Sequence, residues 1–108
     1  MTSVQIFRHS GEYRSFRCCG HTGFAEAGED IVCAGVSAIV INTVNCLQDL
    51  LKEEVEVQYD EEDGDIVCNF LSAPGERAAF LLDCMIHGLK WIQSQYGTQY
   101  LNYEIREV

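Results

Sequence analysis

Residues 31–51 form a long, strongly apolar segment, and this segment constrains the fold more than any other part of the chain. Residues suited to a core recur in it at helical spacing, at Val32, Val36, Ile39, Val40, Thr43, Val44 and Leu47. Its β-branched residues would also suit a strand, but its length and its Leu-Gln-Asp-Leu-Leu-Lys ending favour a helix, for which Asp30 is a suitable N-cap. Because almost nothing polar precedes Asn42, we expect this helix to be buried on most of its sides and to form the main core element.

A second helix is predicted from Glu76, which follows a Pro-Gly pair, to Tyr96, which precedes Gly97. Glycine suits the position just beyond a helix C-terminus because it adopts a left-handed backbone without a steric penalty. The apolar side of this helix consists of Ala79, Leu82, Met85, Ile86, Leu89 and Ile92.

The remaining patterned segments predict strands. Residues 4–9 and 13–19 flank a Ser-Gly-Glu turn, and residues 55–59 and 66–70 alternate apolar with polar side chains around an acidic turn. Residues 100–105 predict a last strand. The resulting order is ββαββαβ, which favours an α+β fold: a mostly antiparallel sheet with two helices packed on it. The length of 108 residues and the absence of a linker predict a single domain over residues 1–108.

Charge and composition exclude several classes of function. The net charge is −10, and residues 53–65 contain eight acids and no base, so the basic stripe of a nucleic-acid-binding protein is missing. The N-terminus lacks the pattern of a signal peptide, and the strongly apolar run at 31–41 is shorter than the roughly 20 residues that span a bilayer. We therefore expect a soluble, cytoplasmic protein that binds neither a membrane nor nucleic acid directly.

Six cysteines in so short a chain would suggest disulfides if the protein were secreted. Their positions argue against a disulfide framework, because Cys18 and Cys19 are adjacent and the others fall inside predicted helices and strands. We expect reduced thiols, most of them small buried side chains.

The segment from Gly20 to Cys33 contains the strongest chemical signal. His21 lies in a loop with glycines at 20, 23 and 28, and Cys33 would be the third residue of a helix capped by Asp30. Unpaired amides of a first helical turn stabilise a thiolate and an oxyanion, and a nearby imidazole can carry the proton. Ser37, one turn later, would lie on the same helix face as Cys33.

Two other interpretations of these residues stay open. A cysteine in an apolar helix is often a plain core residue, and a loop histidine is often solvated. A zinc site built from Cys18, Cys19, His21 and Cys33 is the other alternative, but no Cys-x-x-Cys pair exists, and adjacent strand residues point to opposite faces. We therefore expect no metal site.

The residues Gly20-His21-Thr22-Gly23-Phe24-Ala25, followed by Asp30-Ile31-Val32-Cys33-Ala34-Gly35-Val36-Ser37-Ala38, closely resemble the signature of the ribosomal-processing cysteine protease (Prp) family. Weaker similarity continues through Ile41-Asn42-Thr43-Val44-Asn45 and the helix around Gly88, so the resemblance covers essentially the full chain. One departure is Gly35, where the family pattern leads us to expect alanine.

The resemblance implies a cytosolic endopeptidase that removes the N-terminal extension of large-subunit ribosomal protein twenty-seven during ribosome assembly. Carried over by position, Cys33 is the nucleophile of a thioester mechanism, His21 is the general base and acid, and Asp30 and Ser37 support the pair. The loop containing Gly20, Gly23, Phe24 and Gly28 would close over the peptide. The family further implies a homodimer that needs no metal or organic cofactor.

A different class of function remains as the alternative: a non-catalytic, ribosome-associated module that binds a basic ribosomal protein. Either way the partner is basic, and the acidic chain would attract it electrostatically. Thiol reactivity separates the two, because only a catalytic Cys33 should react much faster than the other cysteines.

Overall fold

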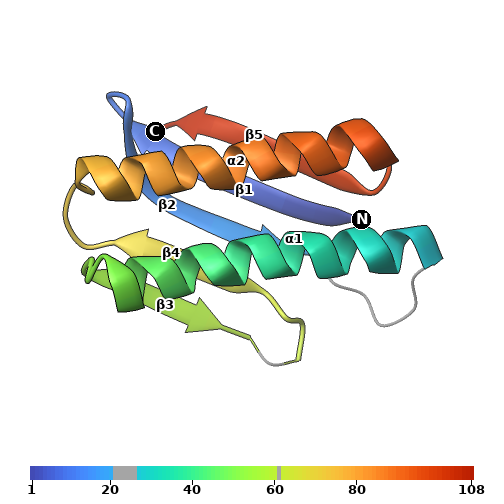
Figure 1. Cartoon of the computed structure of the whole chain (residues 1–108), viewed down its shortest axis with the longest axis horizontal. Helices are drawn as coiled ribbons and strands as arrows, with labels where there is room; N and C mark the ends of the chain where they lie inside the picture. The colour runs from blue at the N-terminus through green and yellow to red at the C-terminus, as the bar shows by residue number, and fades with distance from the viewer. Residues whose placement is uncertain (21–26, 61) are drawn as a thin grey trace.

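The computed structural model describes residues 1–20, 27–60 and 62–108. Within them the elements are β1 (Thr2–His9), β2 (Glu12–Cys19), α1 (Ala27–Asn45), η1 (Cys46–Leu50), β3 (Val55–Tyr59), β4 (Ile66–Phe70), α2 (Glu76–Tyr96) and β5 (Leu101–Glu107) (Figure 1). The predicted order ββαββαβ is confirmed. The element η1 is a π-helical turn that directly continues α1.

The five strands form one sheet in the order β3-β4-β2-β1-β5. Three neighbouring pairs are antiparallel, and only β1 and β5 run parallel. Both helices lie on the same face of this sheet, with α1 on the side of β4 and α2 on the side of β1 and β5 (Figure 1). The chain therefore has the α+β architecture that its sequence predicts.

The core lies between the sheet and the two helices. Alternating side chains of β1, β2 and β4 point into it, for example Ile6, Phe16 and Cys68, all fully buried. The buried side chains of α2 are Ala78, Leu82, Met85, Leu89 and Ile92. This set differs from the predicted apolar side at its edges: Ala79 and Ile86 are only half-buried, and the buried Ala78 was not predicted.

The expectation that the first helix is buried on most sides is wrong. Among residues 30–45 of α1 only one stripe is buried, at Val32, Val36, Val40, Thr43 and Val44, and it continues into Leu47 of η1. Ile31 and Ile41, on the outer side of α1, are 57% and 36% exposed. The reason is tertiary: in the described residues a single layer of helices covers one face of the sheet, so the outer side of that layer faces solvent (Figure 1).

The first helix also begins earlier than predicted. Because α1 starts at Ala27, Asp30 belongs to its first turn and is not its N-cap. Gly28, assigned to the loop from the sequence, lies inside the helix as well. Cys33 is consequently nearly two turns into α1 and not at its third position.

One helical segment among the described residues, Asp30–Leu50, is long and apolar enough to cross a membrane by length and composition alone. A core helix of a globular domain passes the same test, and here the stripe from Val32 to Val44 packs into the hydrophobic core.

Candidate active site

Three of the residues selected from the sequence lie along one side of α1. Asp30, Cys33 and Ser37 are three and four residues apart, which stacks them on successive turns of the helix. Asp30 is exposed, whereas Cys33 and Ser37 are half-buried. The predicted placement of Ser37 on the same face as Cys33 is confirmed by the unbroken helix.

This side of α1 is turned away from α2. The opposite flank of α1 faces α2 closely: an added Cβ on Gly35 would lie 3.6 Å from Ile92 Cδ1, and one on Gly88 would lie 3.1 Å from Ile39 Cδ1. At 100° per residue, Cys33 and Ser37 lie on the other side of the buried Val36 stripe from Gly35 and Ile39. The Cys33 flank therefore faces the half of the sheet formed by β4 and β3.

Cys33 has Cys18, at the end of β2, as a neighbour. Burial raises the pKa of Cys18 to about 12, and the nearby Cys19, Cys33 and Asp65 raise it further by charge repulsion. At neutral pH Cys18 is therefore a protonated thiol beside Cys33, not a competing nucleophile. No sequence pattern predicts the proximity of Asp65 to Cys18, because that proximity depends on the pairing of Cys18 with Ile66 across β2 and β4.

Gly20 directly follows β2 and precedes His21 in the sequence. Its φ of +94° is a left-handed conformation, and an added Cβ would lie 2.3 Å from the carbonyl oxygen of Met1. Only glycine fits this position without strain. His21, Gly23 and Phe24 lie outside the described residues.

The early start of α1 changes the electrostatic argument for Cys33. The unpaired amides of α1 belong to its first turn, and the field of a helix end falls off within that turn. Cys33 lies beyond it, so the predicted support of a thiolate by these amides is weaker than the sequence suggested.

The six cysteines, all in the described part of the chain, are thiols and not disulfides. The expectation that most are buried holds for Cys18 and Cys68 only; Cys84 is exposed and Cys19, Cys33 and Cys46 are half-buried. In the described ranges, which do not contain His21, no three His, Cys, Asp or Glu side chains cluster as metal ligands.

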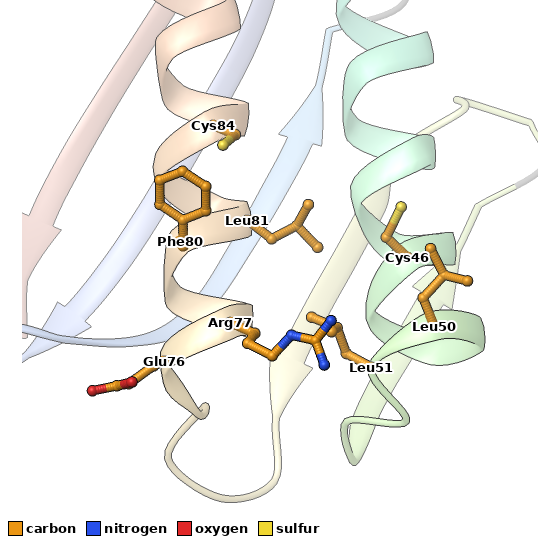
Figure 2. Close-up of a pocket in the computed structure, with 8 residues that line it drawn as sticks. All are labelled: Cys46, Leu50, Leu51, Glu76, Arg77, Phe80, Leu81 and Cys84. Carbon is orange, nitrogen blue, oxygen red and sulfur yellow. The ribbon is translucent and has the colours of Figure 1, made fainter.

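An apolar hollow of about 430 Å³ separates η1 from the first turns of α2 and is lined by Cys46, Leu50, Phe80 and Cys84, among others (Figure 2). It does not belong to the Cys33 site, because Cys46 lies about 20 Å farther along the helix at 1.5 Å per residue.

The α+β sheet-and-helix fold holds a half-buried thiol on its first helix, which is the kind of nucleophile that a cysteine hydrolase uses. The profile of the family described as Cysteine protease Prp matches residues 1–101, and the chain belongs to this family. It is therefore a peptide-bond hydrolase of the cysteine type.

Individual relatives agree with this assignment. The chain is 33% identical over 86 residues to the ribosomal processing cysteine protease Prp of Staphylococcus aureus (strain Mu50 / ATCC 700699), covering 79% of this chain and 81% of the relative. It is 34% identical over 92 residues to the protein of the same name from Bacillus subtilis (strain 168), covering 82% of each.

Solved structures give the same fold. A crystal structure of the S. aureus protease Prp in complex with a substrate peptide superposes with a TM-score of 0.90 at 26% identity, covering 98% of this chain and 100% of that chain. SMU.848 from Streptococcus mutans superposes with a TM-score of 0.84 at 29% identity, covering 100% and 96%.

Proposed function

We propose that this protein is the endopeptidase that removes the N-terminal extension of large-subunit ribosomal protein twenty-seven, acting in the cytoplasm as a single protease domain over residues 1–108. The observation that supports this most is the position of Cys33: half-buried on α1, beside the end of β2, where Gly20 directs the chain toward His21. Family membership and relatives named ribosomal processing cysteine proteases support the same assignment.

In the proposed mechanism the Cys33 thiolate attacks the scissile carbonyl carbon and forms a tetrahedral oxyanion. The oxyanion collapses as the C–N bond breaks, and the His21 imidazolium gives its proton to the leaving amine. The product is a thioester between Cys33 and the N-terminal fragment. His21, now neutral, takes a proton from water as the oxygen of that water attacks the thioester carbon. Breaking of the C–S bond releases the N-terminal fragment as a carboxylic acid, which gives its proton to solvent, and restores the Cys33 thiolate and the His21 imidazolium. No metal or organic cofactor takes part in these steps.

Asp30 and Ser37 are proposed as supporting residues. Both lie on the Cys33 side of α1, and Ser37 is half-buried one turn away, close enough for its hydroxyl to donate a hydrogen bond near the sulfur. Asp30 is exposed in the first turn and is not needed as a cap, so its carboxylate is available to orient the His21 imidazole. The segment containing Gly20, Gly23 and Phe24 is proposed to close over the bound peptide.

We also propose that the enzyme is a homodimer, as the family resemblance implies. The outer side of the helical layer provides apolar surface for such contacts, because Ile31, Phe80 and Trp91 are all more than half exposed. Light scattering coupled to size-exclusion chromatography measures the oligomeric state. A mass of 12.2 kDa at every concentration would reject the dimer.

The acidic charge has a proposed role in this reaction. Ribosomal proteins are basic, and a chain with a net charge of −10 attracts them at long range. Raising the salt concentration should therefore lower kcat/KM for the whole precursor. An unchanged rate would show that long-range attraction contributes nothing.

The decisive experiment is mass spectrometry of the precursor ribosomal protein after incubation with the enzyme and, separately, with Cys33→Ala. We expect a defined N-terminal loss with the unmodified enzyme only. Cys33→Ala should keep its fold, with a change in the free energy of unfolding of at most about 1–2 kcal/mol, because little volume is removed. An intact precursor in both reactions would reject the proposed substrate and favour a module that binds without turnover.

A further inference from the structure

The strand β3 forms one edge of the sheet, because among the described strands it pairs with β4 alone. Its hydrogen bonds fall on alternate residues: the Glu54 carbonyl accepts from the Leu71 N–H, and the Asp60 N–H donates to the Asp65 carbonyl. In an antiparallel pair this alternation directs the even-numbered residues toward β4. The N–H and C=O groups of Val55, Val57 and Tyr59 therefore point outward, away from the sheet, as a template for one more strand.

This edge lies close to the nucleophile. Tyr59 pairs with Ile66 of β4, and Ile66 pairs with Cys18 of β2, so the three residues lie side by side across the sheet. At about 4.8 Å per strand, Tyr59 is about 10 Å from Cys18, which neighbours Cys33. A peptide on the edge of β3 lies one strand spacing farther out, about 14 Å from Cys18. Four to five extended residues cover that distance, so a bond that many residues beyond the paired segment can lie at Cys33. The Cys33 flank of α1 also faces this half of the sheet.

The charge of the edge selects what can pair with it. Residues 53–65 contain eight acids and no base, and Glu54 and Glu56 are exposed on and beside β3. A second copy of this chain, paired edge to edge, would bring its own acids against these, and like charges on neighbouring strands are destabilising. A basic segment would instead gain favourable charge pairs. The exposed ring of Tyr59, 57% accessible, can also stack against a cationic side chain.

We propose that an extended, basic segment of the protein substrate adds to β3 as a sixth strand and thereby holds the scissile bond at Cys33. This inference rests on the proposed proteolytic function and extends it to substrate recognition. Backbone hydrogen bonds to the edge provide affinity, and the acids select for lysine- and arginine-containing segments.

The test is Val57→Pro with Val57→Ala as its matched control. Both replace the valine methyl groups, but only proline removes the outward N–H. Val57→Pro leaves the bonds to β4 intact because those come from the even-numbered residues. Each variant is assayed on the full precursor and on a short neutral peptide that contains the scissile bond but no basic segment.

We expect Val57→Pro to lower kcat/KM for the full precursor about tenfold, mainly through KM, and to leave the short peptide unaffected. Val57→Ala should cleave both like the unmodified enzyme. Equal cleavage of the precursor by Val57→Pro and Val57→Ala would overturn the proposal, while no cleavage by the unmodified enzyme would reject the proposed function itself.

Amide hydrogen exchange provides a measurement that does not depend on the proline variant folding. In the Cys33→Ala protein, addition of the precursor should slow exchange at Val57 and Tyr59, whose N–H groups face outward, and should change Gln58 little. Unchanged exchange at Val57 would overturn the proposal. Loss of a dimer in Val57→Pro would also overturn it, because the edge would then be an interface between two copies.

Discussion

Cys33 and Cys84 provide a direct comparison at the scale of single residues, because Cys33 is half-buried on α1 whereas Cys84 is exposed on α2. Accessibility alone would make Cys84 the most reactive thiol. If a partner imidazole converts Cys33 to a thiolate, Cys33 should react first despite its lower exposure.

We therefore predict that iodoacetamide at pH 7 alkylates Cys33 several-fold faster than Cys84. Peptide mass mapping of samples taken over time measures the two rates. His21→Ala should abolish the difference without altering the rate at Cys84. Labelling of Cys84 ahead of Cys33 in the unmodified protein would contradict an activated nucleophile.

Gly20 supports a second prediction at this scale. Gly20→Ala destabilises the fold in two ways: alanine is strained at the left-handed φ of +94°, and its Cβ would clash with the Met1 carbonyl oxygen at 2.3 Å. We expect it to lower the free energy of unfolding by about 2–4 kcal/mol and to reduce cleavage, because the chain passes from Gly20 directly to His21.

Gly97→Ala is the matched control for Gly20→Ala. Gly97 has a similar φ of +103°, but its added Cβ would be 3.9 Å from the nearest side-chain atom. Gly97→Ala should lower the free energy of unfolding, measured by chemical denaturation, by about 1 kcal/mol and leave cleavage unchanged. Equal losses of stability in both variants would show that the contact with Met1 is unimportant.

At the scale of elements, Gly35 lowers the stability of the first helix. Glycine inside a helix costs about 1 kcal/mol relative to alanine. An added Cβ would lie 3.6 Å from Ile92 Cδ1, an ordinary contact distance. We predict that Gly35→Ala raises the free energy of unfolding by about 0.5–1 kcal/mol, measured by urea denaturation. A loss of stability would mean that the α1–α2 contact cannot accept a methyl group.

The elements themselves were largely predictable. Strand alternation in residues 55–59 and 66–70 matches β3 and β4, and the turn residues before Glu76 and after Tyr96 bound α2 correctly. The start of α1 was not predicted correctly, because Asp30 is a residue type that caps helices but lies three residues after the first residue of α1. A capping residue is a local preference, and tertiary packing decides where a helix begins.

At the scale of the whole molecule, several core groups have raised pKa values. Burial raises the pKa of Cys18 to about 12 and that of Cys68 to about 11, and burial together with the hydrogen bond to Asp83 raises the pKa of Tyr13 to about 12. Each folded group keeps its proton where the unfolded one loses it. Unfolding therefore releases protons above about pH 9, and the free energy of unfolding falls as the pH rises through the window from about 9 to 12.

We predict a steady loss of stability in urea denaturation between pH 8 and pH 11. Cys68→Ala should flatten part of this slope, since it removes one of the groups, while lowering stability at pH 7 by about 1–2 kcal/mol through the small cavity. A stability that does not change between pH 8 and pH 11 would mean that these groups titrate alike in the folded and unfolded chain.

The sequence by itself determined which segments form strands and helices, their order, the α+β class and the likeness to a cysteine protease family, because periodicity, turn residues and the Gly20–Cys33 motif are local along the chain. Tertiary structure alone decided the strand order β3-β4-β2-β1-β5, the exposed outer side of α1, and the proximity of Cys18 to Cys33 and Asp65. Those features depend on which strands pair and which face a helix buries, and contacts between distant segments leave no periodic pattern in a single sequence.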